Sequence, residues 1–175
     1  MNPARVSLFA LTTALFLAPG AAEAATPVRS GGNLGLGVGG GYWHNGLSIK
    51  YFAAPSHSLQ GVVGAYGFNG GLGFTGDYLY EMPALMSDGP LEIGWNIGFG
   101  PSLGVGNNDL AVAIHGTLGL EFNIQPVPID IVLEYKPGIF VLPDVGADLW
   151  HFAGHIRIYP FNWHPQSYPA PPTEG

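Results

Sequence analysis

The 175-residue chain contains no cysteine, few charged side chains and, beyond its first residues, no long hydrophobic run. The absence of cysteine excludes disulfide bonds, a lipid-modified cysteine anchor and thiolate chemistry. Only five residues are Lys or Arg and the net charge is −7, so the chain has no basic surface for nucleic acid. Charged residues make up 10% of the chain. Soluble domains have about 25%, so this chain has too few to cover a water-facing surface.

The N-terminus has the three parts of a secretory signal peptide. Arg5 precedes an apolar run over 6–18, and small residues then lead to Ala24. The run is shorter than the roughly 20 residues that a membrane-spanning helix needs. We therefore predict a signal peptide over 1–24, cleaved after Ala24, and export of a single mature domain.

The clearest pattern in the mature chain is the alternation of residues 110–124. The even positions from Leu110 to Ile124 are almost all large and apolar, whereas the odd positions, among them His115 and Glu121, are small or polar. Successive side chains of a β-strand point to opposite faces. The segment is therefore predicted to be a strand with one hydrocarbon face and one polar face, long enough to span a membrane.

Eight segments of this kind follow one another, with no helical segment between them. Glycine and proline mark the breaks, for example at Asn45-Gly46 and Asn69-Gly70, and we expect prolines at strand ends rather than inside strands. The predicted segments are 32–43, 46–54, 58–68, 72–82, 91–101, 109–124, 128–141 and 148–161.

An even number of antiparallel strands can close without leaving an edge, and eight is the smallest number in bacterial outer-membrane barrels. The predicted fold is all-β, an eight-stranded antiparallel up-and-down transmembrane β-barrel over 31–161. A proline-rich, disordered tail is predicted over 162–175.

The polar positions of these segments collect most of the charged residues of the chain. Lys or Arg facing lipid near the membrane midplane costs about 2–4 kcal/mol, and a dry soluble core could not hold so many charges unpaired. We expect a polar lumen, in which Glu134 pairs with Arg157 and either Lys50 or Lys136 joins neighbouring acids. The predicted lumen network is Lys50, Asp77, Glu81, Glu92, His115, Glu121, Glu134, Lys136, His151, His155 and Arg157, and Asp130 shares their face.

Four phrases of the sequence, at 46–51, 76–79, 127–138 and 155–161, carry a family resemblance. The chain resembles the small eight-stranded outer-membrane β-barrel proteins of Gram-negative bacteria, in an OmpA/OmpX-like subgroup. The resemblance implies insertion by the barrel-assembly machinery, which reads an aromatic residue at the end of the last strand, a role that Phe161 would fill. The chain departs from the family pattern at Pro160, where another aromatic residue is usual, and by continuing beyond Phe161.

Several aromatic residues lie near the predicted strand ends, where amphipathic rings can form a girdle at the lipid headgroups. A soluble-core role for the same rings stays open. The predicted girdle residues are Tyr42, Trp43, Tyr78, Tyr80, Trp150, Tyr159, Phe161 and Trp163.

Candidate catalytic and metal-binding groups are few. A lipid esterase needs a nucleophile, a base and an orienting acid within hydrogen-bond reach. His151 and His155 would lie roughly 13 Å apart on a strand, too far for one metal ion. We therefore expect no catalytic residue, no metal site and no cofactor. The nearest catalytic combination is His115 and Thr117 with Glu121 or Glu134, while Ser48, Ser58 and Ser102 have no evident histidine partner.

The sequence thus predicts a structural, monomeric outer-membrane barrel whose only partners are membrane lipid and the assembly machinery. Eight strands leave a bore just wide enough for side chains, so a general porin is not expected. Two alternatives stay open. One is a secreted soluble barrel that binds a small hydrophobic ligand, and the other is a lipid-modifying outer-membrane enzyme.

Overall fold

The computed structural model describes residues 28–67, 71–88, 90–106, 109–124 and 127–161, which form ten β-strands and no helix. The predicted all-β class is confirmed, whereas the predicted signal peptide and tail lie outside the described residues. The strands are β1 (Leu34–Gly41), β2 (His44–Ala54), β3 (His57–Tyr66), β4 (Leu72–Asp88), β5 (Leu91–Gly106), β6 (Asp109–Ile124), β7 (Ile129–Tyr135), β8 (Gly138–Leu142), β9 (Gly146–Asp148) and β10 (Phe152–Ile158).

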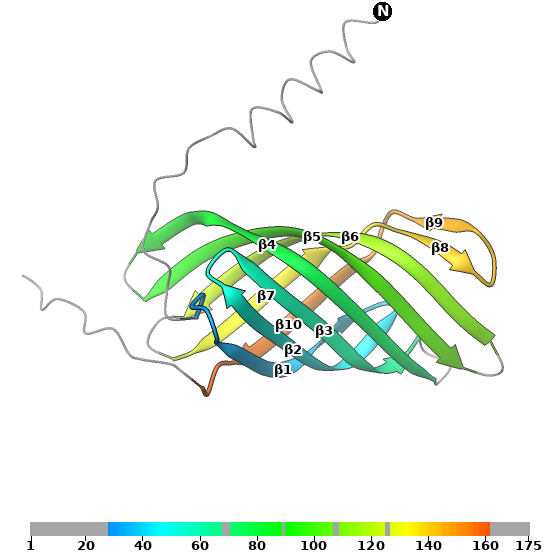
Figure 1. Ribbon diagram of the computed structural model, residues 1–175, viewed down its shortest axis with the longest axis horizontal. Coiled ribbons are helices and arrows are strands. Elements are labelled where there is room, and N and C mark those ends of the chain that lie inside the picture. Colours follow the sequence, from blue (N-terminus) through cyan, green and yellow to red (C-terminus); the bar gives the residue numbers. More distant parts are fainter. Residues whose placement is uncertain (1–27, 68–70, 89, 107–108, 125–126, 162–175) are drawn as a thin grey trace, which may run out of the picture.

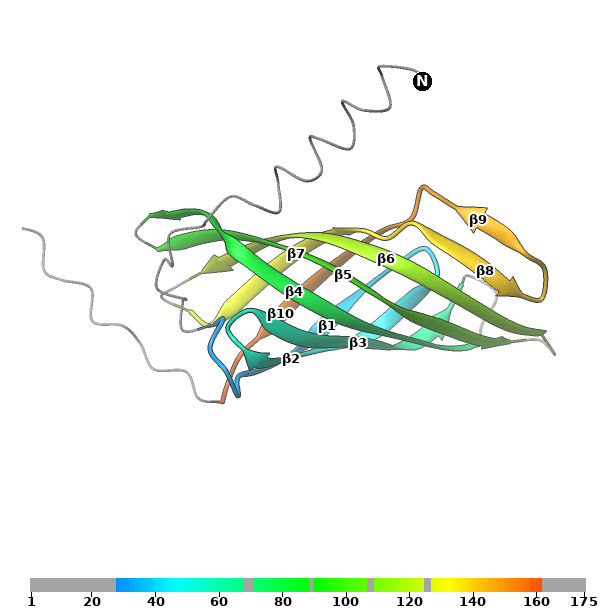
Figure 2. The same cartoon turned by 45° about the horizontal axis from the view of Figure 1, so that its top comes forward.

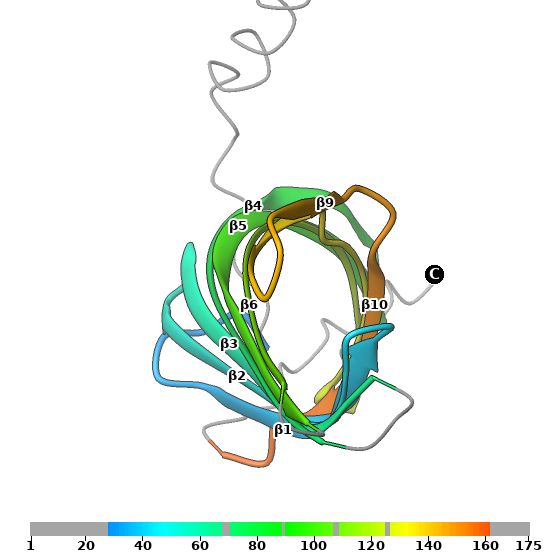
Figure 3. The same cartoon turned by 90° about the vertical axis from the view of Figure 1, so that its right-hand side faces the viewer.

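Eight of the strands close into a ring of antiparallel neighbours. The order around the ring is β1, β2, β3, β4, β5, β6, β7 and β10, and β10 pairs back to β1. Figure 3 looks along the resulting barrel. Every strand in the ring has a paired neighbour on both sides, so the predicted eight-stranded antiparallel barrel is confirmed.

The last two predicted segments, 128–141 and 148–161, are each interrupted. Lys136-Pro137 separates β7 from β8, and residues 149–151 separate β9 from β10. Proline has no N–H for a strand ladder, and the Pro137 carbonyl instead accepts a hydrogen bond from Gly116 N–H at 2.9 Å. The β8–β9 hairpin therefore projects beyond the ring, at the end opposite to the start of β1 and the end of β10 (Figures 1 and 2).

Strand β4 is longer than predicted, because the expected break over 83–90 is mostly strand. The β4–β5 register passes from Met82 opposite Trp95 to Met86 opposite Ile93, so three residues of β4 face one residue of β5. This bulge accommodates Pro83 inside a strand and interrupts the alternation of faces. Consequently the consecutive residues Glu81 and Met82 are both buried.

Strand β5 also continues past its predicted end at residue 101, and Pro101 lies inside it. The expectation that prolines occupy only strand ends is therefore wrong. The register pairs Thr75 with Ser102 and next Tyr78 with Phe99, and Pro101 falls in the interval between them. In the same interval a Cβ atom on Gly100 would lie 1.7 Å from the carbonyl oxygen of Gly76, so only glycine allows this close approach.

The two faces of the sheet differ in chemistry as the alternation predicts. On β6 and β7, Ile114 and Leu133 are 59% and 57% exposed, whereas their neighbours His115 and Glu134 are each 2% exposed. The apolar residues face outward and the ionisable residues face the barrel axis. The inward face is not wholly polar, because Phe52, Leu79 and Val132 are also buried there.

Candidate functional site in the barrel interior

All eleven residues of the predicted lumen network lie inside the barrel, and none is more than 4% exposed. The Lys and Arg residues of the described ranges are all buried there: Arg29, Lys50, Lys136 and Arg157. Six buried carboxylates accompany them: Asp77, Glu81, Glu92, Glu121, Asp130 and Glu134. Buried charges require partners of opposite sign and hydrogen bonds, so the pairing of these groups determines what the interior can do.

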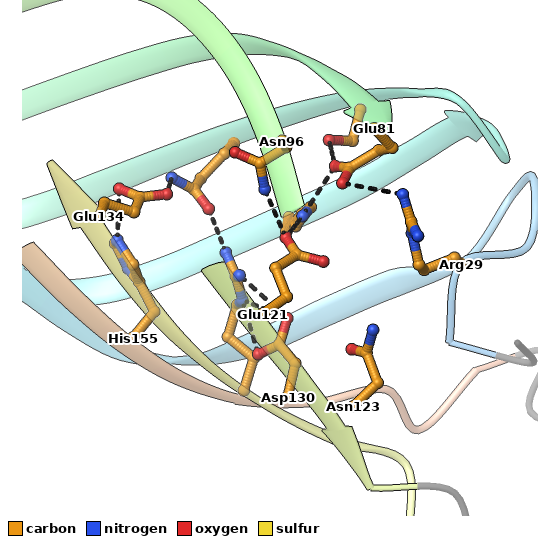
Figure 4. Close-up of polar contacts among 12 residues, drawn as sticks. Arg29, Glu81, Asn96, Glu121, Asn123, Asp130, Glu134 and His155 are labelled. Carbon is orange, nitrogen blue, oxygen red and sulfur yellow. Dashed lines mark hydrogen bonds and ion pairs between the residues drawn. The ribbon is translucent and has the colours of Figure 1, made fainter. Parts of the chain in front are cut away.

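One group of charges is centred on Lys50, near the end of the barrel where β1 begins. Lys50 Nζ lies 2.8 Å from Glu81 Oε1 and also contacts Glu121 Oε1. The amide of Asn96 donates a second hydrogen bond to Glu121, at 2.8 Å. Figure 4 shows Glu81, Asn96 and Glu121 converging from three strands. The prediction that Lys50 joins neighbouring acids is confirmed.

Arg29 belongs to the same group, although it precedes β1 and the predicted start of the barrel at residue 31. Its guanidinium lies 3.6 Å from Glu81 (Figure 4). It also donates to the carbonyl of Met82 at 2.6 Å and lies 3.9 Å from Glu92. Arg29 was not among the predicted lumen residues, because no strand alternation extends to it. The residues before β1 thus contribute a cation to this end of the interior.

Arg157 pairs with Asp130, and the predicted pair of Glu134 with Arg157 is wrong. Arg157 Nη2 lies 2.9 Å from Asp130 Oδ2, and Arg157 Nε donates to Asp130 Oδ1 at 3.0 Å. The β7–β10 register explains the difference, because it sets Asp130 opposite Arg157 and Glu134 opposite Ala153. The hydroxyl of Tyr159 also donates to Asp130.

A second group of charges is centred on Asp77, in the half of the barrel nearer the β8–β9 hairpin. His115 Nε2 donates to Asp77 Oδ1 at 2.7 Å, and His115 Nδ1 lies 3.0 Å from Ser102 Oγ. Thr117 donates to Asp77 Oδ1 and Lys136 donates to Asp77 Oδ2, each at 2.8 Å. Both oxygens of Asp77 are therefore held, and Ser102, His115 and Asp77 form a continuous hydrogen-bonded series.

A similar series surrounds Glu134. His155 Nε2 donates to Glu134 Oε2 at 3.0 Å, and His155 Nδ1 lies 3.0 Å from Ser48 Oγ. Gln60 donates to Glu134 Oε1 at 2.7 Å, and Lys136 Nζ is 3.5 Å from Glu134 Oε2. Lys136 therefore contacts the carboxylates of both series. The prediction that it associates with neighbouring acids is confirmed.

The expectation that Ser48 and Ser102 lack a histidine partner is therefore wrong. Ser48 on β2 reaches His155 on β10 across the intervening strand β1, which carries Gly39 at the crossing. A Cβ atom on Gly39 would lie 2.1 Å from His155 Nδ1, so a larger residue there would displace the imidazole. Ser58, by contrast, donates to Glu81.

The candidate catalytic combination around His115, from which the sequence predicted no activity, does not assemble. Thr117 bonds to Asp77, Glu121 bonds to Lys50, and Glu134 bonds to a different histidine. The acid next to His115 is Asp77, on β4, which is not a sheet neighbour of β6. Contacts across the bore cannot be deduced from strand alternation, because alternation gives the face of a side chain and not its partner.

Trp43 closes the interior at the end nearer the hairpin. Its indole N–H donates to Asp148 Oδ2 of β9 at 3.0 Å, and its ring packs edge-on against His151 and Phe140, with centroids 4.0 and 4.8 Å apart. Trp43 and Tyr159 are 5% and 0% exposed, so their predicted place in an outer girdle is wrong. Neither lies within a strand: Trp43 is in the turn between β1 and β2, and Tyr159 directly follows β10. Five other predicted girdle residues are exposed, namely Tyr42, Tyr78, Tyr80, Trp150 and Phe161, and Trp163 lies outside the described residues.

Little free space remains among these side chains. A cavity beneath Trp43, bordered by Lys136, His151 and His155, has a volume of about 10 Å³, enough for one water molecule. Across the described ranges, no three His, Asp or Glu side chains are grouped so that they could hold a metal ion. No helix in those ranges is long and apolar enough to cross a membrane.

The fold and its interior define a closed eight-stranded antiparallel β-barrel, filled by paired polar side chains and apolar on its outer face. No family model, curated protein or solved structure matches the chain. A functional assignment therefore depends on the chemistry of the barrel itself.

Proposed function

We propose that this chain is a monomeric structural protein of the outer membrane of a Gram-negative bacterium, with a lumen filled by polar side chains. The observation that carries the proposal is the inverted distribution of side chains, apolar on the outside and ionisable on the inside. Large apolar residues of every strand in the ring are exposed, for example Val38, Leu59, Phe99 and Ile156. Acyl chains are the environment in which such an outer face is stable.

The same distribution argues against the secreted soluble barrel. A barrel that binds a hydrophobic ligand needs an apolar cavity, whereas this interior buries six carboxylates and four Lys or Arg side chains. In water the exposed apolar face would also be an aggregation surface. In a membrane the apolar outer face would contact acyl chains, and the polar interior would need to bind no hydrophobic ligand.

The proposed orientation follows from the topology. The start of β1 and the end of β10 lie at one end of the barrel (Figure 1), and this end would face the periplasm, from which the exported chain inserts. Phe161, exposed just after β10, would be the aromatic signal for the barrel-assembly machinery. The β8–β9 hairpin would then face the exterior of the cell.

The filled lumen argues against general diffusion. Lys136 bridges carboxylates from β4 and β7, and Gln60 of β3 links Glu134 to Arg157 of β10, so polar side chains cross the bore at two levels. We expect the purified monomer to give no large, stable conductance steps in planar bilayers. Stable porin-sized steps from the monomer would contradict a closed lumen.

Membrane fractionation combined with heat-modifiability tests the proposal. The unheated protein should remain in the membrane fraction until detergent is added, and it should migrate on a gel differently from the same sample after boiling. A urea-unfolded sample is the control for the denatured position. Recovery in the soluble periplasm or the medium without detergent would support the soluble barrel and contradict the proposal.

A further inference from the structure

We propose that Ser102, His115 and Asp77 form a latent ester-hydrolysing site just inside the mouth of the barrel. Ser102 would be the nucleophile, His115 the base and Asp77 the acid that orients it. The inference goes beyond a structural role and departs from the sequence-based expectation of no catalytic residue. It does not depend on the membrane in which the barrel resides.

The geometry meets the requirements of an activated serine. Ser102 Oγ lies 3.0 Å from His115 Nδ1, and the opposite ring nitrogen, Nε2, lies 2.7 Å from Asp77 Oδ1. These are the separations at which a base can take a hydroxyl proton while an acid fixes the ring. Thr117 and Lys136 hold the Asp77 carboxylate from two sides, so the imidazole is rigidly placed.

Ser102 differs from Ser48, which has the same kind of histidine contact, in what lies beside it. Ser102 borders a crevice that is also lined by the small residues Gly104, Ala111 and Ala113 and by the rings of Trp43, His44, Tyr66 and Phe140. In the closed structure this crevice is too narrow for a water molecule. Its small, apolar wall is suited to a short acyl group if the rings move, and Ser48 does not border it.

The crevice is covered by a contact that can open. The Trp43 ring lies 6.5 Å from the ring of His115, and its N–H is held by Asp148 of β9. Strand β8 is paired with β6, but β9 pairs with β8 and with no strand of the described ring, so few backbone hydrogen bonds oppose movement of β9. Release of Trp43 from Asp148 would open a path from the mouth to Ser102.

The reaction class is hydrolysis of a carboxylic ester with a short apolar acyl group. Ser102 Oγ bonds to the carbonyl carbon as its proton passes to His115 Nδ1, and the ester C–O bond breaks as that proton passes to the departing alcohol. A water molecule, deprotonated by the same nitrogen, then attacks the acyl-serine. The carboxylic acid leaves and Ser102 regains its proton.

Labelling with diisopropyl fluorophosphate tests the site without knowledge of the natural ester. The probe forms a bond from serine Oγ to phosphorus with loss of fluoride, and mass spectrometry locates the adduct on the folded full chain in detergent micelles. We expect a single adduct on Ser102, absent from Ser102→Ala. Asp148→Ala removes the hydrogen bond that Asp148 accepts from Trp43 and also the one that it accepts from the Trp150 backbone N–H, and it should raise the labelling rate about tenfold.

Two further variants separate catalysis from simple reactivity. His115→Gln should lower the labelling rate about 100-fold if the imidazole acts as a base. Ser48→Ala should leave the rate unchanged, because Ser48 does not border the crevice. Heat-modifiability verifies that each variant is folded.

The proposal is overturned if Ser102 remains unlabelled in both the wild type and Asp148→Ala. It is also overturned if labelling of Ser102 is insensitive to His115→Gln. Neither result bears on the structural role, because membrane fractionation tests that role separately.

Discussion

At the scale of single residues, the register of neighbouring strands selects the partner of each buried charge. Arg157 is fully buried, and its guanidinium meets Asp130 because the two residues are opposite one another on β10 and β7. An unpaired guanidinium in this position would keep its desolvation penalty without compensation. The stability of the barrel should therefore depend on the Asp130–Arg157 pair in particular.

Replacement of Asp130 by Ala is expected to lower the free energy of unfolding by about 3–5 kcal/mol, because it leaves Arg157 buried without its carboxylate. Urea titration of the protein in lipid vesicles, followed by tryptophan fluorescence, measures the change. The double variant Asp130→Leu with Arg157→Met should recover most of the loss. A double-mutant cycle that gave stronger coupling of Arg157 to Glu134 than to Asp130 would contradict the observed pairing.

For a single residue, the sequence could predict the face of the side chain but not its partner. The alternation of apolar and polar residues within each strand predicted that the side chains of Glu134, His155 and Arg157 point into the barrel. Their partners depend on register and on contacts across the bore, which one strand does not encode. The reach of His155 over Gly39 to Ser48 is one such contact, and no local pattern signals it.

At the scale of elements, the β8–β9 hairpin is the part of the structure least tied to the ring. Strand β8 pairs with β6, whereas β9 pairs with β8 and is further held by the bond from Trp43 to Asp148. Loss of that bond should loosen the hairpin and leave the ring intact.

Asp148→Ala is therefore expected to increase proteolytic cleavage between β8 and β9 several-fold while the ring stays heat-modifiable. Limited proteolysis of the folded protein, with mass analysis of the fragments, measures the effect. Asp144→Ala removes the same charge from an exposed position of the same hairpin, and it should change the cleavage rate little. Equal cleavage in the two variants would show that the Trp43 contact does not hold the hairpin.

The number and antiparallel direction of the strands in the ring were predictable from the sequence, but the ends of the strands and the separate strands β8 and β9 were not. Pro83 and Pro101 suggested breaks, because a proline cannot donate to a ladder. In the structure a bulge accommodates Pro83, and an interval in the β4–β5 register accommodates Pro101. Such irregularities depend on the facing strand, so the chain around each proline cannot reveal them.

At the scale of the whole molecule, the outer face is apolar and the Lys and Arg residues of the described ranges are all inside. Ile156 lies near the middle of β10 and is 54% exposed, in a position that would face the acyl chains. Val145, in the turn between β8 and β9, is 83% exposed at the mouth.

Ile156→Arg should lower the free energy of unfolding in lipid vesicles by about 2–4 kcal/mol, the cost of Arg near the membrane midplane. Val145→Arg introduces the same side chain outside the hydrocarbon layer, and it should change that free energy by about 1 kcal/mol or less. Reversible urea titration in vesicles measures both values. Equal effects of the two substitutions would contradict a lipid-facing Ile156.

Spin labelling measures the environment of the outer face directly, and the absence of cysteine makes single-site labelling simple. Labels on Leu133→Cys, Ile156→Cys and Val145→Cys in vesicles would be compared by their collisions with oxygen, which concentrates in lipid, and with a water-soluble nickel chelate. We expect oxygen to dominate at positions 133 and 156 and the nickel chelate at 145. Nickel accessibility at 133 and 156 equal to that at 145 would place the apolar face in water and contradict the membrane assignment.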